Sequence, residues 1–101
     1  MDQRTINLRV DGPVAVLTLD RPESLNALNQ QLIEETMKLL DEVEREEGVK
    51  VLVIRGEGRA FCAGADLLFL EEAMKDPPLL RSYLERLNGM LFRLEQLPIP
   101  T

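Results

Sequence analysis

The chain has 101 residues, enough for one small domain, and its 45% apolar and 30% charged residues are ordinary for a globular protein. A formal net charge of -6 without a basic stripe argues against a nucleic-acid partner. No apolar stretch reaches the length of a membrane span, the charged N-terminus lacks the apolar core of a signal peptide, and the single Cys62 cannot form an internal disulfide, so we expect a cytoplasmic protein without a membrane partner.

The chain contains no histidine, which removes several kinds of site. Cys-His and Ser-His nucleophilic pairs are excluded, and so is the commonest metal ligand. We therefore predict no metal site. Without a histidine partner, Cys62 is interpreted as a small buried apolar residue rather than a nucleophile.

The first elements are predicted to form a β-hairpin. Residues 6–10 alternate apolar and polar side chains, which is typical of a half-buried strand. Asp11-Gly12-Pro13 is a turn signal, and residues 14–19 read as a second, more buried strand. Residues 20–24 then form a loop.

A helix follows, for which Asn29 is the predicted N-cap. Its core face is predicted from apolar residues at three- and four-residue spacing: Leu32, Ile33, Thr36, Met37, Leu40 and Val43. The charges within 41–47 indicate a solvated surface, and Gly48 is the stop signal. Residues 49–54 read as a central strand covered on both faces, reached by a parallel crossover.

The rest of the chain is predicted to be a loop and two helices. Residues 56–64 hold three of the six glycines, a short helix begins near Asp66, and Asp76-Pro77-Pro78 ends it. The second helix is amphipathic, with an apolar stripe of Leu80, Tyr83, Leu84, Leu87, Leu91 and Leu94. Residues 97–101 leave it in an extended form, and this apolar ending indicates a missing continuation that would cover the stripe.

The glycine-rich loop is the densest candidate for chemistry. Glycines allow a ligand to approach the backbone closely, and free N–H groups near a helix start can hold an anion or a developing oxyanion. A dinucleotide-binding fingerprint is disfavoured because Phe61 occupies the third glycine position, and a P-loop lacks its Gly-Lys-Ser/Thr. On residue types alone, a merely structural turn is favoured.

Two blocks carry a family resemblance. Asp20-Arg21-Pro22-Glu23-Ser24-Leu25-Asn26-Ala27-Leu28-Asn29 resembles a segment in which Arg-Pro precedes Leu-Asn-Ala-Leu. Arg59-Ala60-Phe61-Cys62-Ala63-Gly64-Ala65-Asp66-Leu67 is similar to a Phe-Cys-Ala-Gly-Ala-Asp-Leu signature. Both blocks resemble motifs of the enoyl-CoA hydratase/isomerase (crotonase) family, and the resemblance spans almost all of the chain. It implies an α/β fold, the N-terminal part of the crotonase-like (ClpP/crotonase) spiral of ββα units, with residues 1–101 as its first portion and the C-terminal remainder absent.

The resemblance also implies a site. The Ala65 N–H matches the first donor of an oxyanion hole, and the CoA part of the substrate is expected to contact Glu23, Ser24, Leu25, Ala27, Ala63, Asp66 and Leu67. Asp66 is interpreted as a loop or helix-cap residue rather than a general base. For Arg21 and Arg59, ion pairing is favoured over a contact with CoA phosphates.

The implied activity is that of a lyase or isomerase on acyl-CoA thioesters, most simply hydration of a 2-enoyl-CoA as in fatty-acid β-oxidation. Double-bond isomerisation and a non-catalytic CoA-binding or assembly module are the alternatives. CoA is part of the substrate, so no separate cofactor is expected. The second oxyanion donor and the acid-base glutamates of hydratases match nothing here, so we expect the 101-residue chain alone to be inactive. Family members assemble as homo-oligomers, trimers or hexamers.

Overall fold

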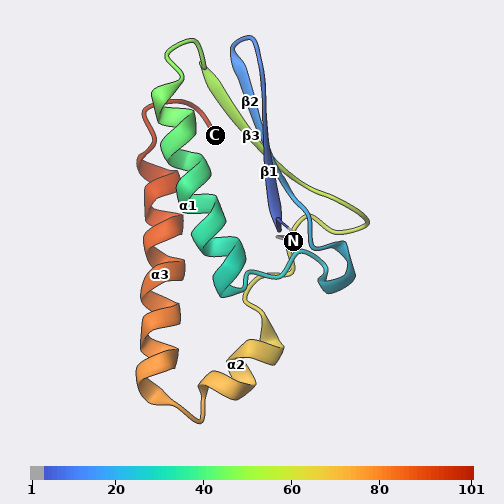
Figure 1. Cartoon of the computed structure of the whole chain (residues 1–101), viewed down its shortest axis with the longest axis vertical. Helices are drawn as coiled ribbons and strands as arrows, with labels where there is room; N and C mark the ends of the chain where they lie inside the picture. Colours follow the sequence, from blue (N-terminus) through green and yellow to red (C-terminus); the bar gives the residue numbers. More distant parts are fainter. Residues whose placement is uncertain (1–3) are drawn as a thin grey trace.

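The computed structural model describes residues 4–101, and it has mixed α/β architecture (Figure 1). The strands are β1 (Ile6–Asp11), β2 (Val14–Leu19) and β3 (Val51–Gly56). The helices are η1 (Pro22–Ser24), a short 3₁₀ turn, and α1 (Gln30–Arg45), α2 (Leu67–Ala73) and α3 (Pro77–Gln96). The hairpin and all three longer helices were predicted from the sequence, and each is confirmed.

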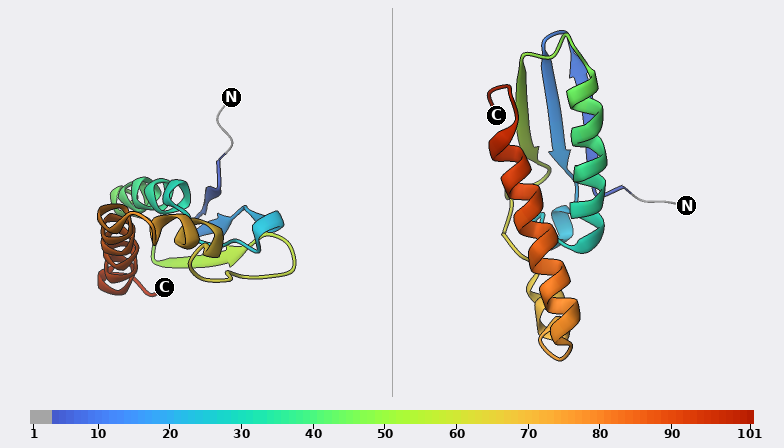
Figure 2. Two further views of the ribbon diagram at one scale, coloured as in Figure 1. Left: turned by 90° about the horizontal axis from the view of Figure 1, so that it is seen from below. Right: turned by 90° about the vertical axis from the view of Figure 1, so that its left-hand side faces the viewer.

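The three strands form one sheet in the order β1-β2-β3. β1 and β2 pair antiparallel and β2 and β3 pair parallel, which confirms the predicted crossover through α1. The alternating pattern directs one face of each strand toward α1, and that face supplies Ile6, Ala15, Leu17, Leu19 and Leu52 to the main core. Figure 2 shows α1 lying against this face and α3 beside α1.

Helix α1 is set by its cap and its apolar stripe. Asn29 has an extended backbone, and its side chain accepts a hydrogen bond from the Leu32 N–H, as predicted for an N-cap. Its buried residues are Leu32, Ile33, Thr36, Leu39, Leu40 and Val43. The prediction omitted Leu39, and Met37 is only partly buried. The helix ends at Arg45, before the Gly48 that was predicted to stop it, because Glu46 is already in an extended conformation.

Helix α3 follows the predicted stripe only in part, with Leu80, Leu87 and Leu94 partly buried. Tyr83 and Met90 are its buried residues, whereas Leu84 and Leu91 are 41% and 49% exposed. The stripe was wrong at these two leucines because they lie outside the face of α3 that packs inward, where Met90 and Leu94 contact the two apolar clusters. Within residues 4–101, no helix is long and apolar enough to cross a membrane.

The position of β3 also corrects a prediction. The segment was expected to be a central strand covered on both faces, but β3 is at the sheet edge and Val53 is 42% exposed. Among the described helices and strands, none packs on the face of β3 that points away from α1. The extended tail lies along its outer edge, where the Leu52 N–H donates to the Pro100 carbonyl at 2.9 Å.

Polar contacts tie the layers together. Arg93 of α3 bonds the carboxylates of Asp41 and Glu44 on α1 at 2.6 and 2.9 Å, so the predicted solvated charge run is partly used for helix packing. The Glu44 hydrogen bond is the main cause that raises the pKa of Arg93. On the other side of α1, Glu35 accepts hydrogen bonds from the Thr5 N–H and hydroxyl at 2.7 and 2.8 Å.

Candidate active site

The two sequence blocks that carried the resemblance lie against each other in the structure. Leu28 and Ala65 form an isolated parallel bridge, in which the Leu28 N–H donates to the Gly64 carbonyl at 2.7 Å. Just before this bridge in both segments, the Ala63 N–H donates to the Leu25 carbonyl at 2.9 Å. Two segments far apart in the sequence are therefore joined through their backbones, and the bridge fixes the loop that precedes α2.

This bridge determines where the Ala65 N–H points. In a trans peptide, the carbonyl of one residue and the N–H of the next point in opposite directions within one plane. Because the Gly64 carbonyl is held by Leu28, the Ala65 N–H points away from Leu28. Within residues 4–101, this N–H makes no hydrogen bond. The protein therefore presents an oriented and unpaired donor at this position.

Asn26 connects the first block to the glycine-rich loop. It is fully buried, in a left-handed conformation with φ of 57°, a region that Asn tolerates better than most residues. Its carbonyl accepts from the Arg21 N–H at 2.7 Å, while its amide donates to the carbonyls of Glu57 and Ala60 at 3.0 and 2.9 Å. The Asn26 side-chain amide therefore fixes both ends of the turn from Glu57 to Ala60 in the glycine-rich loop.

Gly56 makes this contact sterically possible. A Cβ at Gly56 would lie 2.3 Å from the Phe61 carbonyl oxygen, 2.6 Å from that of Ala60 and 2.8 Å from the Asn26 amide nitrogen. No side chain fits there without displacing the loop. The glycine-rich segment is thus required for close approach of backbone segments, and it supports the bridge between Leu28 and Ala65.

Arg21 is used inside the protein, as the sequence favoured. Its guanidinium pairs with Asp66 at 3.3 Å, and both side chains are 14% exposed. It also donates to the Ala27 carbonyl. Asp66 in turn caps α2 by accepting from the Phe69 N–H at 3.2 Å, which confirms its interpretation as a cap. Arg59 is exposed on the loop.

Tyr83 of α3 contacts the Leu28–Ala65 bridge through its hydroxyl group. Its hydroxyl donates to the Leu28 carbonyl and lies 3.4 Å from the Asp66 nitrogen. The side chain is fully buried, and its ring lies 4.7 Å from that of Phe69, centroid to centroid, at 49°. Burial raises the pKa of the Tyr83 phenol above its ordinary value. The hydroxyl therefore stays protonated and serves as a donor.

The predicted CoA-contacting residues lie on both sides of the bridge. Glu23 and Ser24 are in η1, Leu25 follows it with φ of 53°, and Leu67 begins α2 with 74% of its surface exposed. Ala63 is also exposed. Ala27 and Asp66 differ from the others. Ala27 is buried with both backbone groups bonded inside the chain, and the Asp66 carboxylate is held by Arg21.

Sequence reasoning missed the functions of three residues. Asn26, Gly56 and Tyr83 were seen only as members of a motif, a loop and an apolar stripe. A buried tyrosine needs a hydrogen-bond partner, and this requirement was the one available signal for Tyr83. Nothing local in the sequence identifies partners that lie 31 to 55 residues away.

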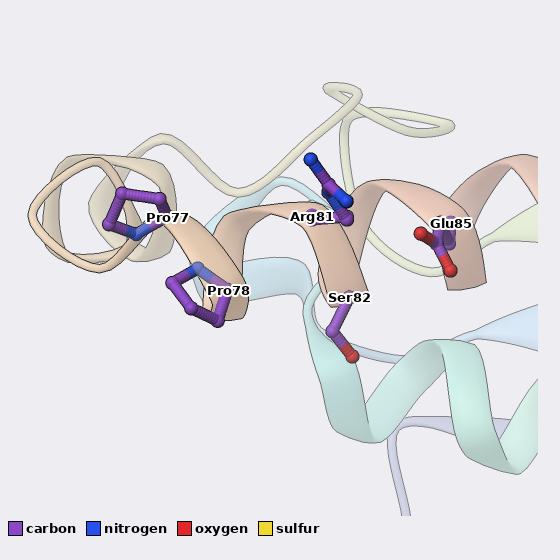
Figure 3. Close-up of a pocket in the computed structure, with 5 residues that line it drawn as sticks. All are labelled: Pro77, Pro78, Arg81, Ser82 and Glu85. Carbon is purple, nitrogen blue, oxygen red and sulfur yellow. The ribbon is translucent and has the colours of Figure 1, made fainter.

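A surface depression at the start of α3 offers no comparable chemistry. It is lined by Pro77, Pro78, Arg81, Ser82 and Glu85, all from one helix, and Figure 3 shows their side chains spread along that helix instead of converging. In the described part of the chain, no group of three or more acidic, Cys or His residues has a metal-binding arrangement. The Leu28–Ala65 bridge is therefore the candidate site.

Comparison with known proteins identifies the family of the chain. A family model described as enoyl-CoA hydratase/isomerase matches residues 14–101. A trans-2-decenoyl-[acyl-carrier-protein] isomerase of Streptococcus mutans is 36% identical, with 99% of this chain and 39% of that protein covered. A probable enoyl-CoA hydratase of Bacillus subtilis is 40% identical over 94% of this chain and 36% of its own length.

The structural comparison gives the same answer. A crystal structure of an enoyl-CoA hydratase from Shewanella pealeana superimposes with a TM-score of 0.88 at 28% identity, covering 97% of this chain and 37% of that one. The α/β architecture of the crotonase fold is thereby confirmed. The chain spans about two fifths or less of the length of these relatives. It belongs to the enoyl-CoA hydratase/isomerase family.

Proposed function

We propose that this chain supplies the thioester-binding wall and one oxyanion donor of an enzyme that hydrates 2-enoyl-CoA. One observation carries the proposal: the Ala65 N–H is fixed in direction by the Leu28–Gly64 hydrogen bond and has no acceptor within residues 4–101. A backbone donor held in this way costs no reorganisation when negative charge develops on a thioester oxygen. Loss of one such donor typically costs roughly 3 kcal/mol of transition-state stabilisation.

The surroundings of this donor suit an acyl-CoA thioester. Phe61 on the loop and Leu67 at the start of α2 present exposed apolar surface, which can pack against pantetheine and acyl carbons. Glu23, Ser24, Leu25 and Ala63 are proposed to contact the CoA part directly. Ala27 and Asp66 adjoin this wall and are proposed to shape it, because their polar groups are already bonded to Arg21.

Acid-base chemistry is proposed to need groups beyond those found here. Asp66 is the carboxylate next to Ala65, but its pairing with Arg21 and its capping bond suit it to a structural role. Hydration of a double bond requires a positioned general acid and base. A verified 101-residue preparation is therefore expected to give no turnover of crotonyl-CoA above the buffer rate, and clear turnover would contradict this assignment.

Double-bond isomerisation is the second candidate, and the Streptococcus mutans relative named as an isomerase favours it. The two reactions share stabilisation of an enolate-like oxyanion and differ in where protons are moved. A non-catalytic CoA-binding or assembly module is the third reading, and absence of turnover with intact binding would favour it. We further propose a cytoplasmic, homo-oligomeric enzyme of fatty-acid metabolism, assembled as trimers or hexamers.

A binding titration tests the proposed site. Crotonyl-CoA is added to the ¹⁵N-labelled chain while backbone amide resonances are followed. Saturable shifts are expected at Glu23, Ser24, Leu25, Ala63, Ala65 and Leu67. The depression at the start of α3 provides the internal control, so the Arg81 and Glu85 amides are expected to stay in place. Absence of saturable binding, or shifts confined to α3, would contradict the proposal.

A further inference from the structure

We propose that the Tyr83 hydroxyl is a positioning group for the Ala65 N–H, acting through Leu28. The inference rests on the proposed function, in which that N–H faces the thioester oxygen. Tyr83 does not touch the reacting atoms in this account. It holds the residue that orients the donor.

Leu28 makes a backbone hydrogen bond on each side of Ala65. Its N–H bonds the Gly64 carbonyl at 2.7 Å, and this bond sets the plane of the peptide that contains the Ala65 N–H. Its carbonyl faces the Asp66 N–H at 3.3 Å, which is long for a backbone hydrogen bond. With only these two bonds, the isolated bridge would be held firmly at one side of Ala65 and weakly at the other.

Tyr83 strengthens the weaker side of the bridge, where Leu28 meets Asp66. Its hydroxyl donates to the same Leu28 carbonyl, and its oxygen lies 3.4 Å from the Asp66 nitrogen. A phenol has one proton to donate and lone pairs to accept with, so one hydroxyl can bond both groups at the weak side. Leu28 and Asp66 are thereby joined through Tyr83 as well as directly.

The Tyr83 side chain is itself held in place by packing. The side chain is fully buried in a second apolar cluster with Ile33 and Met90, and its ring packs on Phe69 of α2. An ordinary core position would be filled equally well by phenylalanine. The hydroxyl adds a polar group that must be bonded when buried, and both of its partners lie at the bridge.

The experiment compares two buried hydroxyls. Tyr83→Phe keeps the ring and removes the bond to Leu28. Thr36→Val is the matched control, because the Thr36 hydroxyl also donates to a backbone carbonyl, that of Leu32 at 2.7 Å, but within α1. Each variant is bound to crotonyl-CoA labelled with ¹³C at the thioester carbonyl, and the resonance of that carbon reports the hydrogen bond from Ala65.

Binding to the wild-type chain is expected to move the carbonyl resonance downfield. Tyr83→Phe should lose about half of this shift or more, with Kd changed by less than about threefold, because a misplaced donor weakens polarisation more than it weakens overall binding. Amide exchange at Leu28, whose N–H bonds the Gly64 carbonyl, should accelerate about fivefold or more as the bridge loosens. Thr36→Val should keep the wild-type shift and the wild-type exchange at Leu28.

The outcomes separate this inference from the proposed function. A full carbonyl shift and unchanged Leu28 exchange in Tyr83→Phe would overturn the role of Tyr83 and leave the donor assignment standing. Equal loss of the shift in both variants would also overturn it, because the effect would then follow general destabilisation. No shift in the wild-type complex would overturn the donor assignment and the role of Tyr83 together.

Discussion

The Asn26 side-chain amide donates to the Glu57 carbonyl at 3.0 Å and to the Ala60 carbonyl at 2.9 Å, partners that lie 31 and 34 residues away in the sequence. One buried amide thus holds the turn after η1 against the glycine-rich loop. The geometry of the candidate site depends on this contact, because the loop that begins at Glu57 ends at Ala65.

Replacing Asn26 with alanine is expected to destabilise the protein by about 3 kcal/mol. The change leaves the part-buried Arg21 N–H and the Glu57 and Ala60 carbonyls without their Asn26 partner, and it places alanine at a positive φ. Urea unfolding followed by circular dichroism measures the effect. Asn88→Ala, at an exposed position of α3, is the control and should change stability by less than about 0.5 kcal/mol. A similar small change for Asn26→Ala would refute the contact's importance.

Gly56→Ala tests the close approach in the loop. The new methyl carbon would lie 2.3 Å from the Phe61 carbonyl oxygen, so the loop must shift, at an expected cost of about 2 kcal/mol. Gly48→Ala is the matched control, since a methyl group added at Gly48 would meet no atom within 4 Å beyond its chain neighbours. That variant should be neutral or stabilised by up to about 1 kcal/mol. Thermal unfolding of both variants measures the contrast, and equal stabilities would contradict the packing described.

Glu35 is expected to make stability depend on pH. Burial raises the pKa of Glu35, but hydrogen bonds from Gln31 and Thr5 outweigh it and lower the pKa below the ordinary value of 4.5. A lowered folded-state pKa gives stability that is present above pH 4.5 and is lost as pH falls through the folded-state value. The free energy of unfolding at about pH 6 and about pH 3.5 should therefore differ less in Glu35→Gln than in wild type.

The control for this prediction is Glu42→Gln, which removes the same charge from an exposed position of α1. It should retain the wild-type dependence on pH. If Glu35→Gln instead retains the full loss of stability between the two pH values, the hydrogen bonds from Thr5 and Gln31 do not contribute to the pH dependence of the free energy of unfolding.

Local signals in the sequence predicted most of the fold. The hairpin turn, the Asn29 cap and the Asp66 cap follow from short-range backbone chemistry, and all three are confirmed. The exposure of Leu84 and the edge position of β3 depend on which elements pack nearby, which periodicity does not specify. The family motif pointed to the loop proposed as the site, but the contacts of Asn26 and Tyr83 join distant parts of the chain and became visible only in three dimensions.

Removal of the Ala65 N–H alone is the most direct test of the central claim. Ligation at the Phe61–Cys62 junction gives access to a chain in which Ala65 is replaced by L-lactic acid, so that an ester oxygen stands in place of the N–H. The same replacement at Ala73 is the control, because that alanine is the last residue of α2 and is not part of the proposed site. The measured quantity is the ¹³C resonance of the thioester carbonyl in bound crotonyl-CoA. The account predicts that the downfield shift is lost in the Ala65 ester and kept in the Ala73 ester, whereas a full shift in the Ala65 ester would contradict it.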